Sequence, residues 1–365
     1  MKINEVIKFL ETIAPPYLQE NYDNAGLITG NSSMDCTGII TTLDCLPETI
    51  NEALKNNCNL IVAHHPIIFK GLKKITGKNY VEETIIKAIK NDIAIYAIHT
   101  NLDNVLNGVN DAIAGKLHLK NTKIISPKPG ILQKLAVFVP EKSKEKLMNA
   151  LFIAGAGSIG NYSECSFQTS GTGTFLPGEF SNPFVGEKGK RHNEAETKIE
   201  VIFPKWKQRE IINEMKNNHP YEEVAYDIFE VQNFTAQYGS GLFGELEYSV
   251  SETEFLSILK EKFSLEVIKH TSFLNKKIKK VAICGGSGIF LLSDAIAAGA
   301  DVFITSDVKY HEYFDASGLI LLADIGHYES EQFTIELLHD KLRENFLNFA
   351  VLKTSIITNP VRYFK

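Results

Sequence analysis

Short apolar runs alternate with longer amphipathic stretches through the first third of the chain. A short run of β-branched and aliphatic residues between polar ones indicates a buried strand of a parallel sheet, and apolar residues three and four positions apart indicate a helix. The pattern predicts a first helix over 1–14, which ends at two prolines. Strands and helices then alternate, in the order strand 38–43, helix 48–56, strand 59–64, helix 81–91, strand 93–98 and helix 109–117.

The same alternation returns in the last quarter of the chain. The predicted elements there are strand 278–284, helix 290–298, strands 301–305 and 319–323, helix 329–343 and strand 349–352. Strands that alternate with helices predict an α/β fold with a largely parallel sheet and helices on its faces. Because the candidate functional residues come from both segments, we expect 1–127 and 237–365 to form one domain.

Between these two segments the pattern changes. It predicts strand 133–139, helix 142–154, strand 164–169, strand 197–203, helix 207–217 and strand 222–229. This βαββαβ order is that of ferredoxin-like α+β domains. We therefore expect 128–236 to be an inserted domain, since about 110 residues is an ordinary domain size. The sequence Gln237-Tyr-Gly-Ser-Gly241 is expected to be the hinge by which the chain returns, and the polar tract 170–192 a loop.

Composition narrows the class of protein. The chain has 365 residues, of which 44% are apolar and 22% charged, as in a soluble globular protein of two domains. A formal net charge of −6 argues against a nucleic-acid partner, which a basic surface would favour. The five cysteines form no Cys-x-x-Cys pair, which favours reduced thiols in the cytoplasm. No apolar run approaches the ~20 residues of a membrane span, so no membrane partner is expected.

Candidate metal ligands follow three of the predicted strands. The segments are His64-His65-Pro66, His99-Thr-Asn-Leu-Asp103 and Gly326-His327-Tyr-Glu-Ser-Glu331. Ligands of open α/β sheets bind beyond the carboxyl ends of the strands, so these side chains are expected to meet at one edge of the sheet. The alternative is a set of separate core or surface histidines. Three strand-end clusters of matching chemistry favour a common site.

The spacing within the clusters favours two metal ions. Successive strand residues point to opposite faces, so His64 and His65 suit two neighbouring ions, and Pro66 keeps His65 extended. Glu331 is the i+4 neighbour of His327 on a helix, and a carboxylate can bridge two ions whereas an imidazole cannot. Iron, zinc, manganese and cobalt all suit such ligands. We therefore predict two divalent ions, with open positions for water or substrate, on the ligands His64, His65, Asp103, His327 and Glu331.

A glycine-rich turn lies between a predicted strand and a predicted helix, at Cys284-Gly-Gly-Ser-Gly288. Glycines let backbone N–H groups approach an anion, so Gly286, Ser287 and Gly288 are candidate phosphate contacts. The alternative, a tight turn that merely needs small residues, is equally open, because the pattern is shorter than a complete nucleotide-binding motif.

Other polar residues near strand ends have supporting roles in this interpretation. Asp44, Asp307 and Asp324 either accept hydrogen bonds from metal-bound imidazoles or cap helices. His99 is a candidate proton carrier, with a structural role as the favoured alternative. No side chain is predicted to be the nucleophile, because water activated by the metal ions would serve.

Six segments spread over nearly the whole chain resemble one known family. They are Tyr22-Asp-Asn-Ala-Gly-Leu-Ile28, Ala63-His-His-Pro66, Ile98-His-Thr-Asn-Leu-Asp103, Gly239-Ser-Gly-Leu-Phe-Gly244, Thr305-Ser-Asp307 and Asp324-Ile-Gly-His-Tyr-Glu-Ser-Glu331. The chain resembles the Nif-three-like dinuclear-metal proteins, which are also called GTP cyclohydrolase 1 type 2 homologues. The resemblance implies the same five ligands, with Glu331 as the bridge, and a long form of the family with an inserted PII/CutA-like domain. It also implies a homohexamer in which two stacked trimers enclose the metal sites.

Charge and ligand chemistry favour a metal-dependent hydrolase. Two divalent ions outweigh the charges of Asp103 and Glu331, so the site is expected to attract a small anionic substrate, such as a nucleotide or another phosphorylated compound. The resemblance implies GTP ring opening of the cyclohydrolase type, although nothing in the spacing identifies GTP. Two other hypotheses stay open: a metal-binding, metal-delivery or regulatory oligomer without turnover, and an oligomeric scaffold with structural metal. Vacant coordination positions argue against the scaffold.

Overall fold

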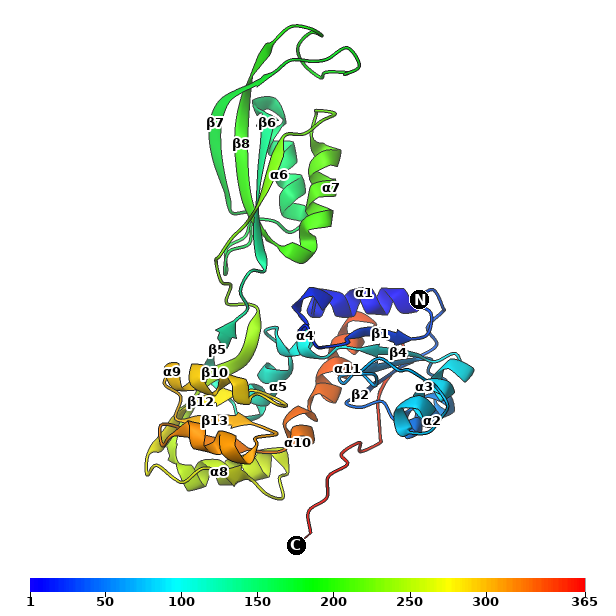
Figure 1. Ribbon diagram of the computed structural model, residues 1–365, viewed down its shortest axis with the longest axis vertical. Helices are drawn as coiled ribbons and strands as arrows, with labels where there is room; N and C mark the ends of the chain where they lie inside the picture. The colour runs from blue at the N-terminus through cyan, green and yellow to red at the C-terminus, as the bar shows by residue number, and fades with distance from the viewer. Residues whose placement is uncertain (365) are drawn as a thin grey trace. The chain divides into compact units, whose positions relative to one another are not determined.

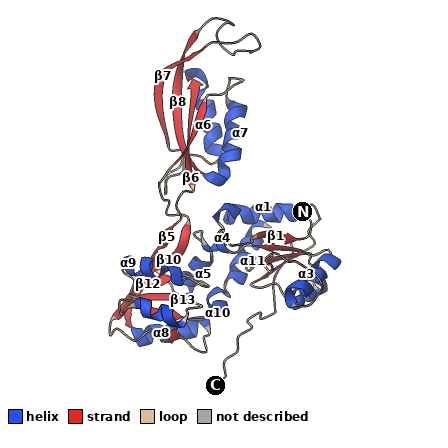
Figure 2. Cartoon of the chain, in the orientation of Figure 1, coloured by secondary structure: helices blue, strands red, loops and turns tan. Residues whose placement is uncertain are grey.

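The computed structural model describes residues 1–364, which form two compact units of mixed α/β structure. The first combines Met1–Pro127 with the chain from Gln237 onward, and the second is Lys128–Ala236. Figure 1 shows the course of the chain and Figure 2 its helices and strands. Among the described residues, no helix is both long and apolar enough to cross a membrane.

The first unit contains a five-stranded sheet in the order β1-β4-β3-β2-β15. Its strands are β1 (Gly26–Thr29), β2 (Ile39–Thr42), β3 (Leu60–Ala63), β4 (Ala94–Ala97) and β15 (Val351–Lys353). Neighbouring strands are parallel except β1 and β4. Every residue of β2, β3 and β4 is buried, which explains the continuous apolar runs in the sequence.

Helices from distant parts of the chain pack on this sheet. α2 (Pro47–Lys55) and α3 (Tyr80–Lys90) pack against each other and against its strands, and α11 (Thr334–Asn345) packs against β2 and β15. Local sequence sets where they begin: Pro47 opens α2, where its missing N–H costs nothing, and the Asn79 side chain caps α3 by accepting a hydrogen bond from the Glu82 amide. The other helices of the first 120 residues are α1 (Ile3–Ile13), α4 (Thr100–Asp103) and α5 (Val109–Lys116).

A second sheet of the first unit has six strands in the order β11-β14-β13-β12-β10-β5. They are β5 (Lys120–Pro127), β10 (Gly239–Ser251), β11 (Lys269–His270), β12 (Lys277–Ile283), β13 (Val302–Thr305) and β14 (Leu321–Asp324). The central β12, β13 and β14 are parallel, and the other pairs are antiparallel. The helices of this part are α8 (Glu252–Phe263), α9 (Leu292–Ala297) and α10 (His327–Glu331). Short 3₁₀ helices of the chain lie at Pro16–Leu18, Glu141–Ser143, Lys205–Lys207, Ile289–Leu291 and Tyr310–Ala316.

The two sheets correct the prediction of one largely parallel sheet. The strands predicted in the first third and in the last quarter of the chain are present. Those of the first third form the five-stranded sheet, whereas those of the last quarter, except β15, belong to the six-stranded sheet. The candidate ligands therefore do not lie along one sheet edge. The apolar pattern identifies a buried strand, but it carries no information about which sheet the strand joins.

The segment expected to be a hinge is part of a strand instead. Gly239 and Gly241 lie in β10, which pairs with both β5 and β12. A Cβ atom on Gly239 would be 2.2 Å from the backbone oxygen of Ser126, so this glycine permits close strand packing rather than flexibility. The predicted helix 329–343 is also wrong in detail, because the chain forms two separate helices there, α10 and α11.

The second unit contains a four-stranded antiparallel sheet in the order β7-β8-β6-β9. Its elements are β6 (Leu132–Pro140), α6 (Lys144–Ile153), β7 (Ser166–Phe175), β8 (His192–Pro204), α7 (Gln208–Asn218) and β9 (Tyr226–Glu230). Alternate strand residues such as Leu135, Val137 and Ile199 form a core with Leu151 and Ile211 of the two helices. β7 and β8 extend into the tract 170–192, so the loop between them is shorter than predicted.

Candidate metal centre

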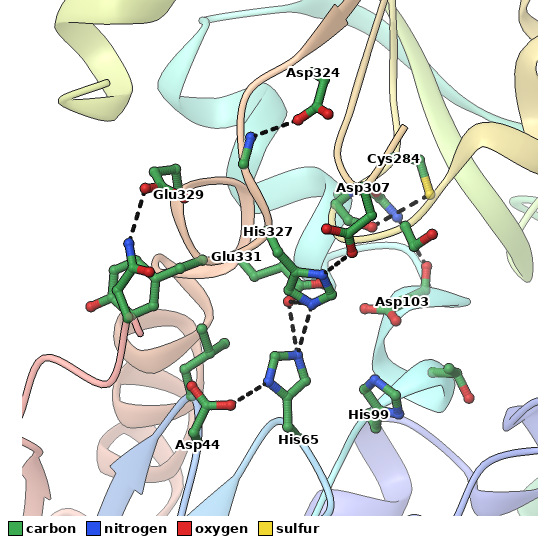
Figure 3. A pocket seen from close by; sticks show the side chains of 18 of the residues that line it. Asp44, His65, His99, Asp103, Cys284, Asp307, Asp324, His327, Glu329 and Glu331 are labelled. Atoms are coloured by element: carbon green, nitrogen blue, oxygen red, sulfur yellow. Dashed lines mark hydrogen bonds and ion pairs between the residues drawn. The ribbon is translucent and has the colours of Figure 1, made fainter. Parts of the chain in front are cut away.

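The five predicted ligands come together between β3 and α4 on one side and α10 on the other. Figure 3 shows four of them, His65, Asp103, His327 and Glu331. His64 and His65 directly follow β3, and Asp103 is the last residue of α4, which follows β4. His327 and Glu331 are the first and last residues of α10, which follows β14 of the second sheet. Both sheets of the first unit therefore contribute to the cluster.

Glu331 lies at the middle of the cluster and is only 3% exposed. Its Oε2 is 2.9 Å from Nε2 of His65 and 3.1 Å from Nε2 of His327. Its Oε1 is 3.8 Å from Nε2 of His64, and that nitrogen is 3.6 Å from Oδ1 of Asp103. Oε2 of this carboxylate therefore faces His65 and His327, whereas Oε1 faces His64, whose Nε2 in turn faces Asp103. Two oxygens that face different side chains are what a bridging carboxylate requires.

Two buried polar atoms of the cluster indicate that it is built for a cation. Among the described residues, Nε2 of His64 and Oδ1 of Asp103 have no hydrogen-bond partner. Leaving such an atom unpaired costs about 1–3 kcal/mol. Atoms that ligate one ion at ~2.1 Å stand at most ~4.2 Å apart, so the 3.6 Å between these two atoms fits a shared ion. The donor set of imidazoles and carboxylates fits the divalent ions predicted from the sequence.

The far side of each imidazole is held by a hydrogen bond. Nδ1 of His64 donates to the backbone oxygen of Ile98 at 2.8 Å, which leaves Nε2 as the nitrogen that faces the cluster. Nδ1 of His65 lies 2.8 Å from Oδ1 of Asp44, and Nδ1 of His327 lies 2.6 Å from Oδ2 of Asp307. Asp44 and Asp307 thus orient imidazoles, the first of the two roles predicted for them.

Asp324 has a different place. Its carboxylate accepts hydrogen bonds from the backbone amides of Val308 and Gly326 and pairs with Lys269 at 2.6 Å. It therefore fixes the segment after β13, at Val308, and the turn that leaves β14, at Gly326, rather than an imidazole. The predicted role of Asp324 as an imidazole acceptor is wrong in this structure.

The carboxylates and imidazoles of the cluster shift one another's pKa values. Burial alone would lower the pKa of His65, but its contacts with Asp44 and Glu331 raise it to about 9. The same opposition holds at His327, where Asp307 and Glu331 raise the pKa to about 11. Burial and the charge of Glu331 raise the pKa of Asp103 to about 7. Although burial opposes it, the neighbouring imidazoles hold the pKa of Glu331 well below its usual value. Without metal, the cluster therefore retains protons that a cation would displace.

His99 lies beside the metal-ligand cluster, which a purely structural role would not require. One ring nitrogen each of His64, His65 and His99 lie within 4.8 Å of one another. Nδ1 of His99 lies 2.8 Å from Oδ1 of Asp23, whose other oxygen accepts a hydrogen bond from the Thr100 amide at 3.1 Å. Burial opposes the shift, but these contacts lower the pKa of Asp23 to about 2. The residue-by-residue reasoning missed Asp23, and the only signal was its place in the Tyr22–Ile28 segment that carries the family resemblance.

The glycine-rich turn serves the cluster by allowing close approach. Gly286 has a φ of +62°, and a Cβ atom there would be 2.3 Å from Oε1 of Glu331. Its amide donates to Oγ of Ser330 at 3.0 Å, and the amide of Gly288 donates to Oγ1 of Thr305 at 2.8 Å. Two of the three amides predicted to contact phosphate therefore already have protein acceptors. The phosphate contact stays a prediction, carried by Ser287, which lines the neighbouring cavity.

A cavity of about 650 Å³ opens beside the cluster. Among the described residues that line it, the carboxylates are Glu20, Asp44, Asp103, Asp307, Asp324, Glu329 and Glu331, whereas Lys269 is the one lysine or arginine. Two divalent ions and Lys269 would bring five positive charges against these seven carboxylates. The net positive charge expected from the sequence counted only the two ions, Asp103 and Glu331. The other carboxylates around the cavity would make its total charge negative, so an anion would have to bind at the ions themselves.

Comparison with known proteins identifies the family of the chain. A family model described as Duf34/NIF3 (NGG1p interacting factor 3) matches residues 1–360. The chain belongs to the Duf34/NIF3 family. The family resemblance carried by the six sequence segments is thereby confirmed.

Several relatives of this Duf34/NIF3 chain are similar along their length. A GTP cyclohydrolase 1 type 2 homolog of Bacillus subtilis (strain 168) is 39% identical over 326 residues, 89% of this chain and 87% of the relative. A protein of the same name from Staphylococcus epidermidis is 36% identical over 100% of both chains. Among solved structures, a Bacillus cereus protein related to NIF3 has 36% identity and a TM-score of 0.87, over 100% of this chain and 99% of that one.

Proposed function

We propose that the chain binds two divalent metal ions at this cluster. The first would be held by His64, Asp103 and Glu331, and the second by His65, His327 and the same Glu331. These two groups are called the His64 half and the His65 half. The observation that carries the proposal is the position of Glu331, because its Oε2 faces His65 and His327 while its Oε1 faces His64.

The function that this centre supports best is metal-dependent hydrolysis of a nucleotide or another phosphorylated compound. Divalent ions, when bound, supply positive charge that stabilises negative charge developing on the substrate. The relatives named GTP cyclohydrolase 1 type 2 homolog support a reaction of the GTP cyclohydrolase type. The cavity of about 650 Å³ lies within the usual range of ~300–1,000 Å³ for small-molecule sites.

The chain's own side chains would assist in two ways. His99 lines the cavity, and its Nδ1 is held by Asp23, so its Nε2 is the nitrogen available to hold or move a proton. Lys269 lines the same cavity, but it is paired with Asp324 at 2.6 Å, which limits its use as an anion contact. Recognition of an anionic group therefore rests on the metal ions, with Ser287 as the further candidate.

A second candidate function is metal delivery or regulation without turnover. The observation that favours it is the strongly carboxylate-lined cavity, which suits cations better than anions. A nucleotide hydrolase and a metal-delivery protein differ in turnover, not in stoichiometry, so activity must be measured together with metal content.

The test combines elemental analysis with an activity screen on GTP, other nucleoside phosphates and simple phosphoesters. We expect two ions per chain, and turnover that disappears after chelation and returns when metal is added. Glu331→Ala should lose turnover, and the exposed Glu344→Gln on α11 is the matched control that should keep it. Two bound ions without any turnover would favour the delivery function, and protein that binds no metal would refute both functions.

We further propose that the second unit is a ferredoxin-like, PII/CutA-like insert that folds independently. Its element order and its strand order β7-β8-β6-β9 support this. At the insertion point Pro127 and Gly239 are paired across β5 and β10. The two ends are therefore close enough for a short hairpin turn to replace 128–236. The shortened protein should keep two ions, and loss of both ions with the insert would refute independence.

The family resemblance implies a homohexamer and the cysteine pattern favours the cytoplasm, and we retain both as part of the proposal. An enclosed chamber would exclude bulk water and strengthen the electrostatics of the centre. Light scattering on the purified protein tests this part, since a stable monomer would remove the hexamer while leaving the metal centre intact.

A further inference from the structure

The end of the chain, Thr354–Tyr363, follows β15 without regular secondary structure and is called the C-terminal strap. It is the red segment of Figure 1 that leads to the C-terminus. Its beginning is fixed to the first sheet, because the Thr354 amide donates to the backbone oxygen of Thr41 at 3.0 Å. The Ser355 amide and hydroxyl both donate to Oε1 of Glu52, at 2.7 and 2.6 Å. The strap therefore leaves the sheet in a defined direction.

The middle of the strap reaches the carboxylate that holds His65. Oγ1 of Thr358 donates to Oδ2 of Asp44 at 2.6 Å, and Oδ1 of the same carboxylate lies 2.8 Å from Nδ1 of His65. Thr358 is only 7% exposed, so water does not readily replace its hydroxyl. The two contacts fix both oxygens of Asp44 and hence the plane in which it meets the imidazole.

The end of the strap contacts the element that carries His327. Nδ2 of Asn359 donates to Oε1 of Glu329 on α10 at 2.9 Å. A Cβ atom on Gly326, the residue before His327, would be 3.6 Å from the hydroxyl oxygen of Tyr363. Asn359, Tyr363 and the residues Pro360 and Val361 also line the cavity. The strap thus contacts the carboxylate behind His65 and the helix that carries His327.

The His64 half is supported in another way. Nδ1 of His64 donates to the backbone oxygen of Ile98, and the carbonyl oxygen of Asp103 accepts a hydrogen bond from Nδ2 of Asn110 at 3.2 Å. Both supports belong to the first 127 residues, far from the strap in sequence. Glu331 is the only ligand of the His64 half that lies on α10, so loss of the strap should affect the His65 half more than the His64 half.

We propose that the C-terminal strap positions the His65 half of the metal centre, with Thr358 acting through Asp44 on His65 and Asn359 acting through Glu329 on α10. The inference rests on the proposed two-ion centre and adds a part of the chain that contacts neither ion. Thr358 is a positioning residue, since its hydroxyl touches the carboxylate behind the imidazole and no metal ligand.

The experiment loads the full-length protein with Zn²⁺ and follows its release to a colorimetric chelator, which resolves two ions as two phases. Replacing the residue that hydrogen-bonds a metal-bound histidine typically weakens metal affinity about 10- to 100-fold. Thr358 contacts that residue, Asp44, rather than the histidine, so its replacement should weaken the affinity by about tenfold. Thr358→Val, which keeps the shape and removes the hydroxyl, should therefore release one ion about tenfold faster and the other at the wild-type rate. Asn359→Ala should change the same phase.

Two controls separate positioning from a general loss of structure. Thr358→Ser keeps a hydroxyl and should restore the slow phase, and Ser355→Ala removes a strap contact remote from the centre and should leave both phases unchanged. Equal acceleration of both phases, or no change in Thr358→Val, would overturn the inference while two bound ions still support the proposed centre. Wild-type protein that holds no Zn²⁺ would overturn the proposed centre and the inference with it.

Discussion

The two halves of the candidate centre use the same kinds of ligand but are built differently. The His64 half takes two of its three ligands, His64 and Asp103, from segments beside a single sheet, and its imidazole is fully buried and held by a backbone carbonyl. The His65 half joins residues from both sheets, its imidazoles are held by the carboxylates of Asp44 and Asp307, and the side chain of His327 is 40% exposed. The His64 half thus depends on the second sheet through Glu331 alone, and its imidazole does not line the cavity, whereas the His65 half takes both His327 and Glu331 from that sheet and all its ligands line the cavity.

Because of this difference, the two halves should bind their ions with different strength. An imidazole that donates to a carboxylate is a more basic metal ligand than one that donates to a carbonyl, and its orientation depends on that carboxylate. The buried half needs a cation to satisfy the unpaired atoms of His64 and Asp103. The cavity-facing half is the one that substrate can reach. We therefore expect the His64 half to hold its ion more permanently and the His65 half to exchange its ion with solvent.

The largest expected effect is that of Glu331, because it is the part that the two halves share. Glu331→Ala should reduce bound metal from about two ions per chain to none, since each ion loses a ligand and each half keeps two. Elemental analysis after dialysis measures this, with Glu344→Gln as the control on an exposed helix position. Retention of one full equivalent in Glu331→Ala would mean that the carboxylate serves a single ion.

Removing one ligand from each half should separate them. Asp103→Asn should abolish binding of one ion and His327→Ala that of the other, and neither change should release both. Spectra of Co²⁺-loaded variants measure which half is occupied, because the two ligand sets differ in their number of imidazole nitrogens. Identical residual spectra from the two variants would show that the halves are not separate sites.

The carboxylates behind the imidazoles should have a smaller effect, limited to one half. Asp44→Asn and Asp307→Asn should each weaken one ion about 10- to 100-fold and leave the other unchanged. Asp324→Asn is the matched control at another strand end, since its carboxylate bonds to Val308, Gly326 and Lys269 rather than to an imidazole. It should change thermal stability more than metal affinity. Chelator competition with each variant measures these affinities, and an equal loss in all three would contradict the assignment.

One prediction needs only a change of buffer, because it concerns the protons that the His65 half holds. In the metal-free protein the pKa values of His65 and His327 are raised to about 9 and about 11, so stability from these charged imidazoles is present below about pH 6.5 and is lost as pH rises through 9 and 11. Metal must displace the same protons, so affinity should rise by about tenfold per pH unit for each proton displaced. Thermal unfolding and calorimetric titration between pH 6 and 9 should therefore show stability falling with pH without metal and rising with metal. The same trend in both forms would contradict the account.

Much of this site could be predicted from sequence because its residues follow short buried strands. The runs before His64 and His99 are apolar throughout, and β3 and β4 bury all their residues. The i+4 spacing of His327 and Glu331 correctly places both on one short helix. Such local patterns need no knowledge of the rest of the fold.

What the sequence does not reveal depends on contacts between distant segments. The division of strands between two sheets depends on pairing partners, which an apolar run does not encode. Asp23 meets His99 across 76 positions and Thr358 meets Asp44 across 314, and neither residue is part of a local motif for metal support. The glycines of β10 suggest a hinge until the close approach of Ser126 is known.

The central claim is that one carboxylate separates two ions. Anomalous diffraction from crystals of the full chain loaded with Zn²⁺, recorded on both sides of the zinc absorption edge, tests it most directly. The account predicts two peaks, one between His64 and Asp103 and the other between His65 and His327, with the Glu331 carboxylate between them. A single peak, or peaks outside this cluster, would contradict it.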